Sequence, residues 1–222
     1  MSARGNTETE RLREELTALR ERGCTMLVVG EVPTEVSRRA CAALGGGIDR
    51  ELVTVHTGGD HACGADEHDE HAHEIRWDDR ARGATTAAAG DLQFAPAEGG
   101  ATVSTLGELS EATMAAIERA AEGTDPGELR VCVDSLGPLV EDTSERSVFR
   151  FCHQLGGAVR EAKGLGHVHL PMAHESERAT VLGALFDVTV ELELFGGEPR
   201  QRWYLHEAGI VSDWLPIGVN HE

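Results

Sequence analysis

The stretch Met26–Ser37, which reads MLVVGEVPTEVS, decides the fold of this chain of 222 residues. It opens with four consecutive apolar residues, a pattern typical of a strand that is buried on both faces. The apolar run ends at Gly30, and Pro33 or Thr34 then begins a helix that three glycines, Gly45–Gly47, close. A buried strand that leads directly into a helix predicts an α/β fold.

The same alternation continues on both sides of this stretch. Further strands are predicted at Leu52–Val55, Ala101–Leu106, Leu129–Val133 and His167–Leu170, and further helices at about 8–22, 108–121, 149–159 and 180–185. Buried strands that alternate with helices favour a mainly parallel sheet, because parallel neighbours need long crossover connections.

The end of the chain has a different pattern. Val188–Leu194 alternates apolar and polar residues, Gly196 and Gly197 follow it, and then comes the segment Gln201–Leu205. This pattern predicts a β-hairpin on an antiparallel edge of the sheet. The expected organisation is therefore an N-terminal helix, a single domain and a short tail, at 1–23, 24–217 and 218–222.

The charge of the chain narrows the choice of partners. Asp and Glu number 39 against 20 Lys and Arg, which gives a net charge of -19, and Lys163 is the single lysine. This balance argues against nucleic acid and anionic lipid, since phosphate contacts need clustered cations. Acidic residues spread over the whole chain are typical of a cytoplasmic protein from a high-salt organism; an acidic face that binds a partner is the alternative.

The sequence shows no pattern typical of a membrane span or a signal peptide, and its cysteines do not suggest a set of disulfide bonds. No apolar run approaches the roughly 18 residues that a membrane span needs, and the first eight residues lack the apolar stretch of a signal peptide. The five cysteines are an odd number, which favours reduced thiols in a cytoplasmic setting. Four of them are interpreted as small core residues: Cys24, Cys41, Cys132 and Cys152.

The junction between the first strand and its helix is where nucleotide-binding proteins carry G-x-x-x-x-G-K-[ST]. In that register Gly30 and Ser37 are present, but Glu35 replaces the second glycine and Val36 replaces the lysine. Pro33 also removes one backbone N–H from the loop. The loop therefore lacks the cation that phosphate groups require, and Gly30 and Ser37 remain as part of a vestigial nucleotide site.

The second motif that accompanies such a loop in nucleotide-binding proteins, an apolar strand that ends in an aspartate, is easier to find. Arg130–Ser135 is an apolar strand that ends in Asp134, and an aspartate at this place holds Mg²⁺ in nucleotide hydrolases. We include Asp134 in the vestigial nucleotide site. The alternative is that Asp134 caps the following turn while Ser135 forms local hydrogen bonds. No cofactor is expected, and ATP with Mg²⁺ would bind only if the variant loop still functions.

Four segments together resemble a known family, and they are 131–140, 149–155, 185–192 and 209–217. The first resembles the second nucleotide motif of the RecA superfamily in its KaiC-like branch. From about residue 24 to 217 the chain looks like a haloarchaeal family of degenerate, transducer-like (HTR-like) KaiC-like proteins of unknown function. The resemblance implies a RecA/KaiC-like three-layer sandwich and a protein partner in a signalling or regulatory pathway. It implies no known reaction, and Val36 stands where active relatives have a lysine.

A second chemical feature is the stretch from 57 to 82, which is polar and is expected to be a loop. Five of the 11 histidines lie between 56 and 73. His61, Cys63, His71 and His73 could supply four ligands to Zn²⁺, Ni²⁺ or Cu²⁺. The alternative is an acidic, solvated insertion without a bound ion. Cys63 is the one cysteine in a polar loop, so it is expected to be the most reactive thiol.

These observations favour a non-catalytic KaiC-like domain that acts in signalling or regulation through protein contacts. One alternative is a KaiC-like ATPase that binds ATP through its variant loop. A second alternative is a metal-responsive module built on the 56–74 loop. The sequence leans against an enzyme because of Val36, and it does not predict the oligomeric state.

Overall fold

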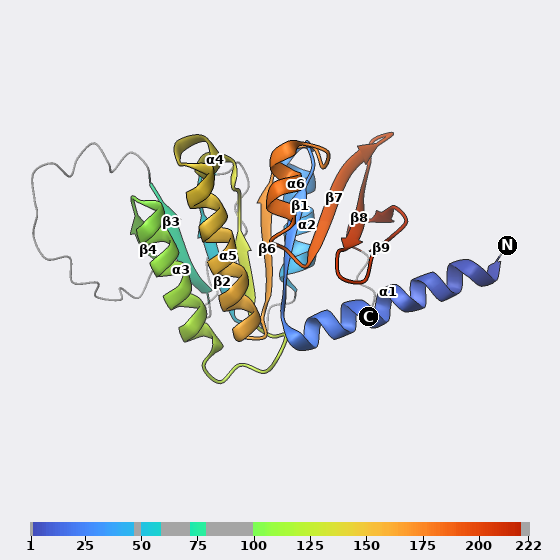
Figure 1. Ribbon diagram of the computed structural model, residues 1–222, viewed down its shortest axis with the longest axis horizontal. Helices are drawn as coiled ribbons and strands as arrows, with labels where there is room; N and C mark the ends of the chain where they lie inside the picture. The colour runs from blue at the N-terminus through green and yellow to red at the C-terminus, as the bar shows by residue number, and fades with distance from the viewer. Residues whose placement is uncertain (1, 47–49, 59–71, 79–99, 219–222) are drawn as a thin grey trace, which may run out of the picture.

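The computed structural model describes residues 2–46, 50–58, 72–78 and 100–218, and these form a three-layer α/β domain (Figure 1). The helices are α1 (Ser2–Arg22), α2 (Thr34–Gly45), α3 (Leu106–Ala121), α4 (Gly137–Asp142), α5 (Glu145–Glu161) and α6 (Glu177–Gly183). The strands are β1 (Cys24–Val29), β2 (Leu52–His56), β3 (Ala72–Trp77), β4 (Ala101–Val103), β5 (Arg130–Val133), β6 (Leu165–Leu170), β7 (Val188–Phe195), β8 (Glu198–Leu205), β9 (Ile210–Val211) and β10 (Leu215–Pro216).

All the described strands belong to one sheet in the order β10-β8-β7-β1-β6-β5-β2-β3-β4, with β9 paired to β8. The run from β7 to β4 is parallel throughout. The pairs that involve β8 are antiparallel, so β8, β9 and β10 form an antiparallel edge. The predicted α/β fold, with a mainly parallel sheet and a C-terminal antiparallel hairpin, is therefore confirmed.

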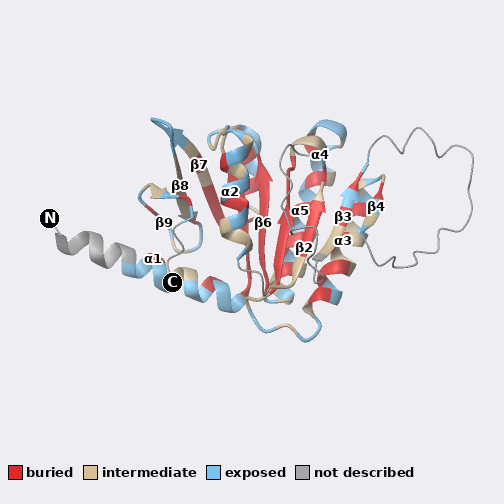
Figure 2. Cartoon of the chain, turned by 180° about the vertical axis from the view of Figure 1, so that it is seen from behind, coloured by how far each residue is buried: buried red, intermediate tan, exposed pale blue. Residues whose placement is uncertain are grey.

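Each face of the sheet carries its own hydrophobic cluster. On one face, residues of α3, α4, α5 and α6 pack with alternate strand residues such as Leu27, Val133 and Val168. On the other face, residues of α1 and α2 pack with Met26, Val28 and the inner side of β7. Every residue of the central strands β1, β5 and β6 is buried (Figure 2). Burial on both faces explains why β1 and β5 are mostly apolar in the sequence, whereas β6 also carries the buried His167 and His169.

Local signals set the helix starts more accurately than apolar spacing does. The helix expected from about residue 108 begins at Leu106, because Thr105 and Glu108 form a reciprocal capping box. Ser144 and Ser176 are the N-caps of α5 and α6, and the side chain of each accepts a hydrogen bond from the amide three residues later. The short helix α4 was not predicted, and it follows Asp134 and Ser135 directly in the chain.

The expectation that residues 57–82 form a loop is wrong for part of the stretch. Residues 72–77 form β3, a parallel strand that pairs with β2 and β4. Its apolar residues Ile75 and Trp77 are buried, whereas Arg76 between them is exposed. A strand with only two large apolar residues escapes a search for apolar runs, although the alternation itself is a strand signal.

Within the described part of the chain, no helix has both the length and the apolar character that a membrane crossing would require.

Candidate functional site

The order of the strands marks one place at the carboxyl edge of the sheet. The connection after β1 runs through α2 toward β2, whereas the connection after the adjacent β6 runs through α6 past β1 to β7. The loops that follow β1 and β6 therefore diverge, and α2 and α6 lie on opposite faces of the sheet (Figures 1 and 2). Open α/β sheets bind their ligands at such a switch point.

A cavity of about 110 Å³ lies at this switch point. Its walls come from the ends of β1 and β6, the start of α2, Ser135 and Leu192. Gly30 and Ser37, two of the residues predicted for the vestigial nucleotide site, both line it. The other polar lining residues are Thr34 and His169, and the described residues contribute no lysine or arginine to the lining. We call this space the switch-point cavity.

Gly30 has a structural reason to be glycine. Its φ is +138°, and a Cβ at this position would collide with the backbone oxygen of Leu192 in β7. Its backbone N–H donates a hydrogen bond to the carbonyl of Met172, at 2.8 Å. In a phosphate-binding loop the corresponding amides point at the anion. Here the amide of Gly30 joins the end of β1 to the segment after β6.

Two backbone amides in the first turn of α2 also donate hydrogen bonds within the protein. The amides of Val36 and Ser37 donate to the carbonyl of Pro33, at 2.8 and 3.3 Å. The side chain of Val36 is buried in the cluster with Met26 and Val28, so it lies in the core rather than facing the cavity mouth. Glu35 is exposed and forms an ion pair of 2.6 Å with Arg38. Val36, which stands at the lysine position, is therefore part of the hydrophobic core.

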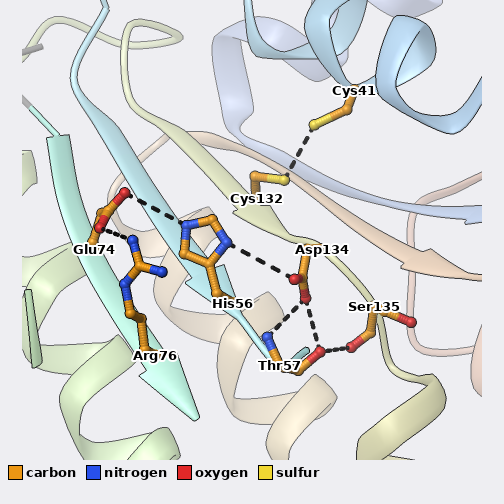
Figure 3. A network of polar contacts seen from close by, with 8 residues as sticks. All are labelled: Cys41, His56, Thr57, Glu74, Arg76, Cys132, Asp134 and Ser135. Carbon is orange, nitrogen blue, oxygen red and sulfur yellow. Dashed lines mark hydrogen bonds and ion pairs between the residues drawn. The ribbon is translucent and has the colours of Figure 1, made fainter. Parts of the chain in front are cut away.

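Asp134 is not directed at the switch-point cavity. Its carboxylate is 2% exposed, and its Oδ1 accepts hydrogen bonds from the backbone N and the hydroxyl of Thr57, at 2.9 and 2.8 Å (Figure 3). Asp134 therefore ties the end of β5 to the end of β2. Ser135 forms the expected local contact, since its hydroxyl accepts a hydrogen bond from the amide of Gly137 at 3.0 Å.

A histidine that the sequence interpretation did not single out lies between two carboxylates. His56, at the end of β2, has its Nδ1 3.8 Å from Oδ2 of Asp134 and its Nε2 3.6 Å from Oε1 of Glu74 (Figure 3). Glu74 also pairs with Arg76 at 2.8 Å. We call these residues, together with Thr57, the His56 network. The sequence signal for His56 and Asp134 is a polar residue at the end of an apolar strand, since His56 ends β2 and Asp134 follows β5.

The predicted metal ligands are placed only in part. His61, Cys63 and His71 lie outside the described residues. His73 lies in β3, where burial, followed by the nearby guanidinium of Arg119, lowers the pKa of its imidazole. The positive charge of Arg119 works against a cation at His73.

Two groups of three side chains with suitable ligand atoms lie among the described residues, and His73 belongs to neither. In each group the three ligand atoms lie within 4.8 Å of one another. One group is buried and the other is partly exposed: Cys41 with Cys132 and His167, and His174 with Glu175 and Glu191.

Comparison with known families places these features in a wider group. A family model matches residues 23–192, from just before β1 to the middle of β7, which is well over half of the chain. The chain belongs to the family of unknown function DUF7504. The DUF7504 match contains the switch-point cavity, the His56 network and both groups of possible ligands. All of α1 and all of β8 to β10 lie outside it. Comparison with curated proteins gives no match.

Proposed function

We propose that this DUF7504 protein is a non-catalytic RecA/KaiC-like domain that acts in signalling or regulation through protein contacts. Three features support the proposal: the parallel sheet with its switch point, the altered loop at 30–37, and the acidic surface. The single observation that carries it is the closed junction at Gly30, where the amide donates to Met172 and the α-carbon lies against Leu192.

The closed junction works against a nucleotide in two ways. Phosphate binding needs unengaged amides and positive charge at a helix start. The amides of Gly30, Val36 and Ser37 donate hydrogen bonds within the protein. The charged residues between Gly30 and Val36 are Glu31 and Glu35, and both are acidic. Val36 brings no positive charge to the loop, and the nearby guanidinium of Arg38 is engaged in its ion pair with Glu35.

The size of the cavity supports the same conclusion. The switch-point cavity measures about 110 Å³, whereas pockets for drug-sized ligands and cofactors span roughly 300–1,000 Å³. Its lining mixes hydroxyl groups with valine and leucine side chains, and among the described residues the only ionisable one in the lining is the buried His169. A nucleoside triphosphate would need both more space and more cationic partners.

The surface offers apolar contacts near the same edge of the sheet. Leu194 and Phe195 at the end of β7 are 43% and 61% exposed. Aromatic side chains exposed in this way are common anchors in protein interfaces. The guanidinium of Arg200 lies 4.1 Å from the centre of the Phe195 ring, within cation-π range. These residues give a protein partner an exposed apolar anchor at the end of β7.

A calorimetric titration with ATP and Mg²⁺ in high salt tests the proposal against the ATPase alternative. We expect no saturable heat with the wild-type protein up to millimolar nucleotide. Saturable binding in the micromolar range that Ser37→Ala weakens would overturn the proposal, because Ser37 lines the cavity at the start of α2. Thr180→Ala is the matched control, since Thr180 is an exposed helical residue away from the cavity.

A further inference from the structure

Three potential ligands meet where α2 crosses the sheet. Cys132 of β5 and His167 of β6 are direct cross-strand neighbours, so their side chains lie on the same face. Cys41 of α2 packs onto them. Its Sγ lies 3.4 Å from Sγ of Cys132 and 3.2 Å from Nε2 of His167. Figure 3 shows the two sulfur atoms facing one another beside the His56 network.

These distances agree with the edges of a metal tetrahedron. Zn²⁺ binds sulfur at about 2.3 Å and imidazole nitrogen at about 2.0–2.1 Å. Tetrahedral coordination then separates two sulfur ligands by about 3.8 Å and a sulfur from a nitrogen by about 3.6 Å. The observed separations are only a few tenths of an ångström shorter. A bound ion would fit after small rotations of side chains that already converge from three elements.

The redox state decides whether the ligands are available. In this structure the sulfur of Cys132 is disulfide-bonded, whereas the sulfur of Cys41 is not. A dithiol or phosphine reductant would convert that disulfide to two thiols by donating two electrons, with two protons taken up, and would itself be oxidised. The metal site therefore belongs to the reduced protein, in which Cys132 can act as a thiolate ligand.

We propose that the reduced protein binds a zinc-class divalent ion through Cys41, Cys132 and His167. Two thiolates balance the charge of the ion, and the neutral imidazole completes a set of ligands that such ions prefer. The fourth position is left for water or another ligand. The inference is independent of the proposed function, and it uses different residues from the metal ligands predicted in the 56–74 loop.

The surroundings suit a structural ion. Cys41, Cys132 and His167 are 5%, 1% and 0% exposed, and a closed site of this kind is typical of structural zinc. The ring of His167 also contacts His169, which lines the switch-point cavity. An ion here would fasten α2 to the sheet beside that cavity.

The test uses Co²⁺ as the probe on the full chain, purified without a histidine tag, kept in high salt and reduced with a phosphine. Tetrahedral thiolate coordination gives a sulfur-to-cobalt charge-transfer band and intense d–d bands. We expect both bands to saturate at one ion per chain. Cys41→Ser and Cys132→Ser should each weaken the charge-transfer band and lower the Co²⁺ affinity more than about tenfold.

Cys152→Ser is the matched control. Cys152 is equally buried, but it lies in α5 within the cluster on the opposite face of the sheet, so the cobalt bands should not change. The proposal is overturned if the reduced wild-type protein shows no charge-transfer band, or if the band survives in both serine variants. It is also overturned if the bands are lost only when His71→Ala and His73→Ala are combined.

X-ray absorption of the zinc-loaded wild-type protein tests the same ligands without any variant, so the test still holds if a serine variant fails to fold. We expect two sulfur scatterers at about 2.3 Å and at least one nitrogen at about 2.0–2.1 Å from zinc. A zinc shell made only of nitrogen and oxygen would contradict the assignment.

Discussion

Gly30 donates its backbone N–H to the carbonyl of Met172 at 2.8 Å, and this bond joins the two divergent loops of the switch point. In an open α/β sheet these loops normally leave a crevice for a ligand. Here the junction draws them together, and a cavity of about 110 Å³ remains. The same glycine that resembles the first residue of a phosphate loop thus closes the place where phosphates would bind.

Gly30→Ala should destabilise the protein by about 1–3 kcal/mol, since a non-glycine residue is strained at positive φ. The new methyl group would also collide with the backbone oxygen of Leu192. Denaturant unfolding in high salt measures the change. Gly45→Ala is the matched control, because this helical glycine has open space around its α-carbon, and alanine favours the helix by roughly 0.5–1 kcal/mol. Equal stability of the two variants would contradict the closed junction.

The contact between Asp134 and Thr57 should contribute to stability. Asp134→Asn is expected to cost about 1.5–3 kcal/mol, because its buried carboxylate accepts hydrogen bonds from the amide and hydroxyl of Thr57. Thr57→Val should cost about 0.5–1.5 kcal/mol by removing the hydroxyl donor. Unfolding of the two single variants and the double variant measures the coupling. If the two losses simply add, the carboxylate and the hydroxyl do not interact in the folded protein.

The leucine stripe of α1 packs on the domain, which its short length alone does not predict. Leu19 is 4% exposed and lies in the cluster beneath α2 and β7. Leu19→Ala should therefore cost about 2–5 kcal/mol in unfolding experiments on the full chain. Leu194→Ala is the control, and its cost should be far smaller because Leu194 is 43% exposed. A neutral Leu19→Ala would indicate that α1 does not dock on the sheet in solution.

The sequence predicts β1 and β5 well because each contains a run of apolar residues, as in Met26–Val29. In β6 the apolar residues alternate with His167 and His169, and the predicted strand starts two residues after the observed start at Leu165. The sequence misses β3, since only Ile75 and Trp77 carry its burial. It also misses the His56 network for a different reason. His56 and Asp134 meet only because β2 lies beside β5, a neighbour relation that strand order along the chain does not give. Pairing between distant segments is decided by packing, so local patterns identify the ends of strands but not which ends meet.

Tyr204 offers a direct spectroscopic test, because it is the single tyrosine of the chain. Burial, followed by its hydrogen bond of 2.6 Å to Glu191, raises the pKa of its phenol above the ordinary value of 10.0. Because the pKa of the phenol is higher in the folded state, the protonated phenol of Tyr204 stabilises the fold, and this stabilisation is complete below the unfolded pKa. It is lost as the pH rises through the folded pKa.

Absorbance of the tyrosinate during an alkaline titration should therefore give a higher pKa in the folded protein than in the same chain in denaturant. Glu191→Gln keeps a hydrogen-bond acceptor but removes the negative charge, so the folded pKa should move down toward the unfolded value. Glu193→Gln is the control, because Glu193 pairs with Arg200 instead and its loss should leave the titration of Tyr204 unchanged. A wild-type pKa equal to that of the unfolded chain would show that the phenol is not held against Glu191.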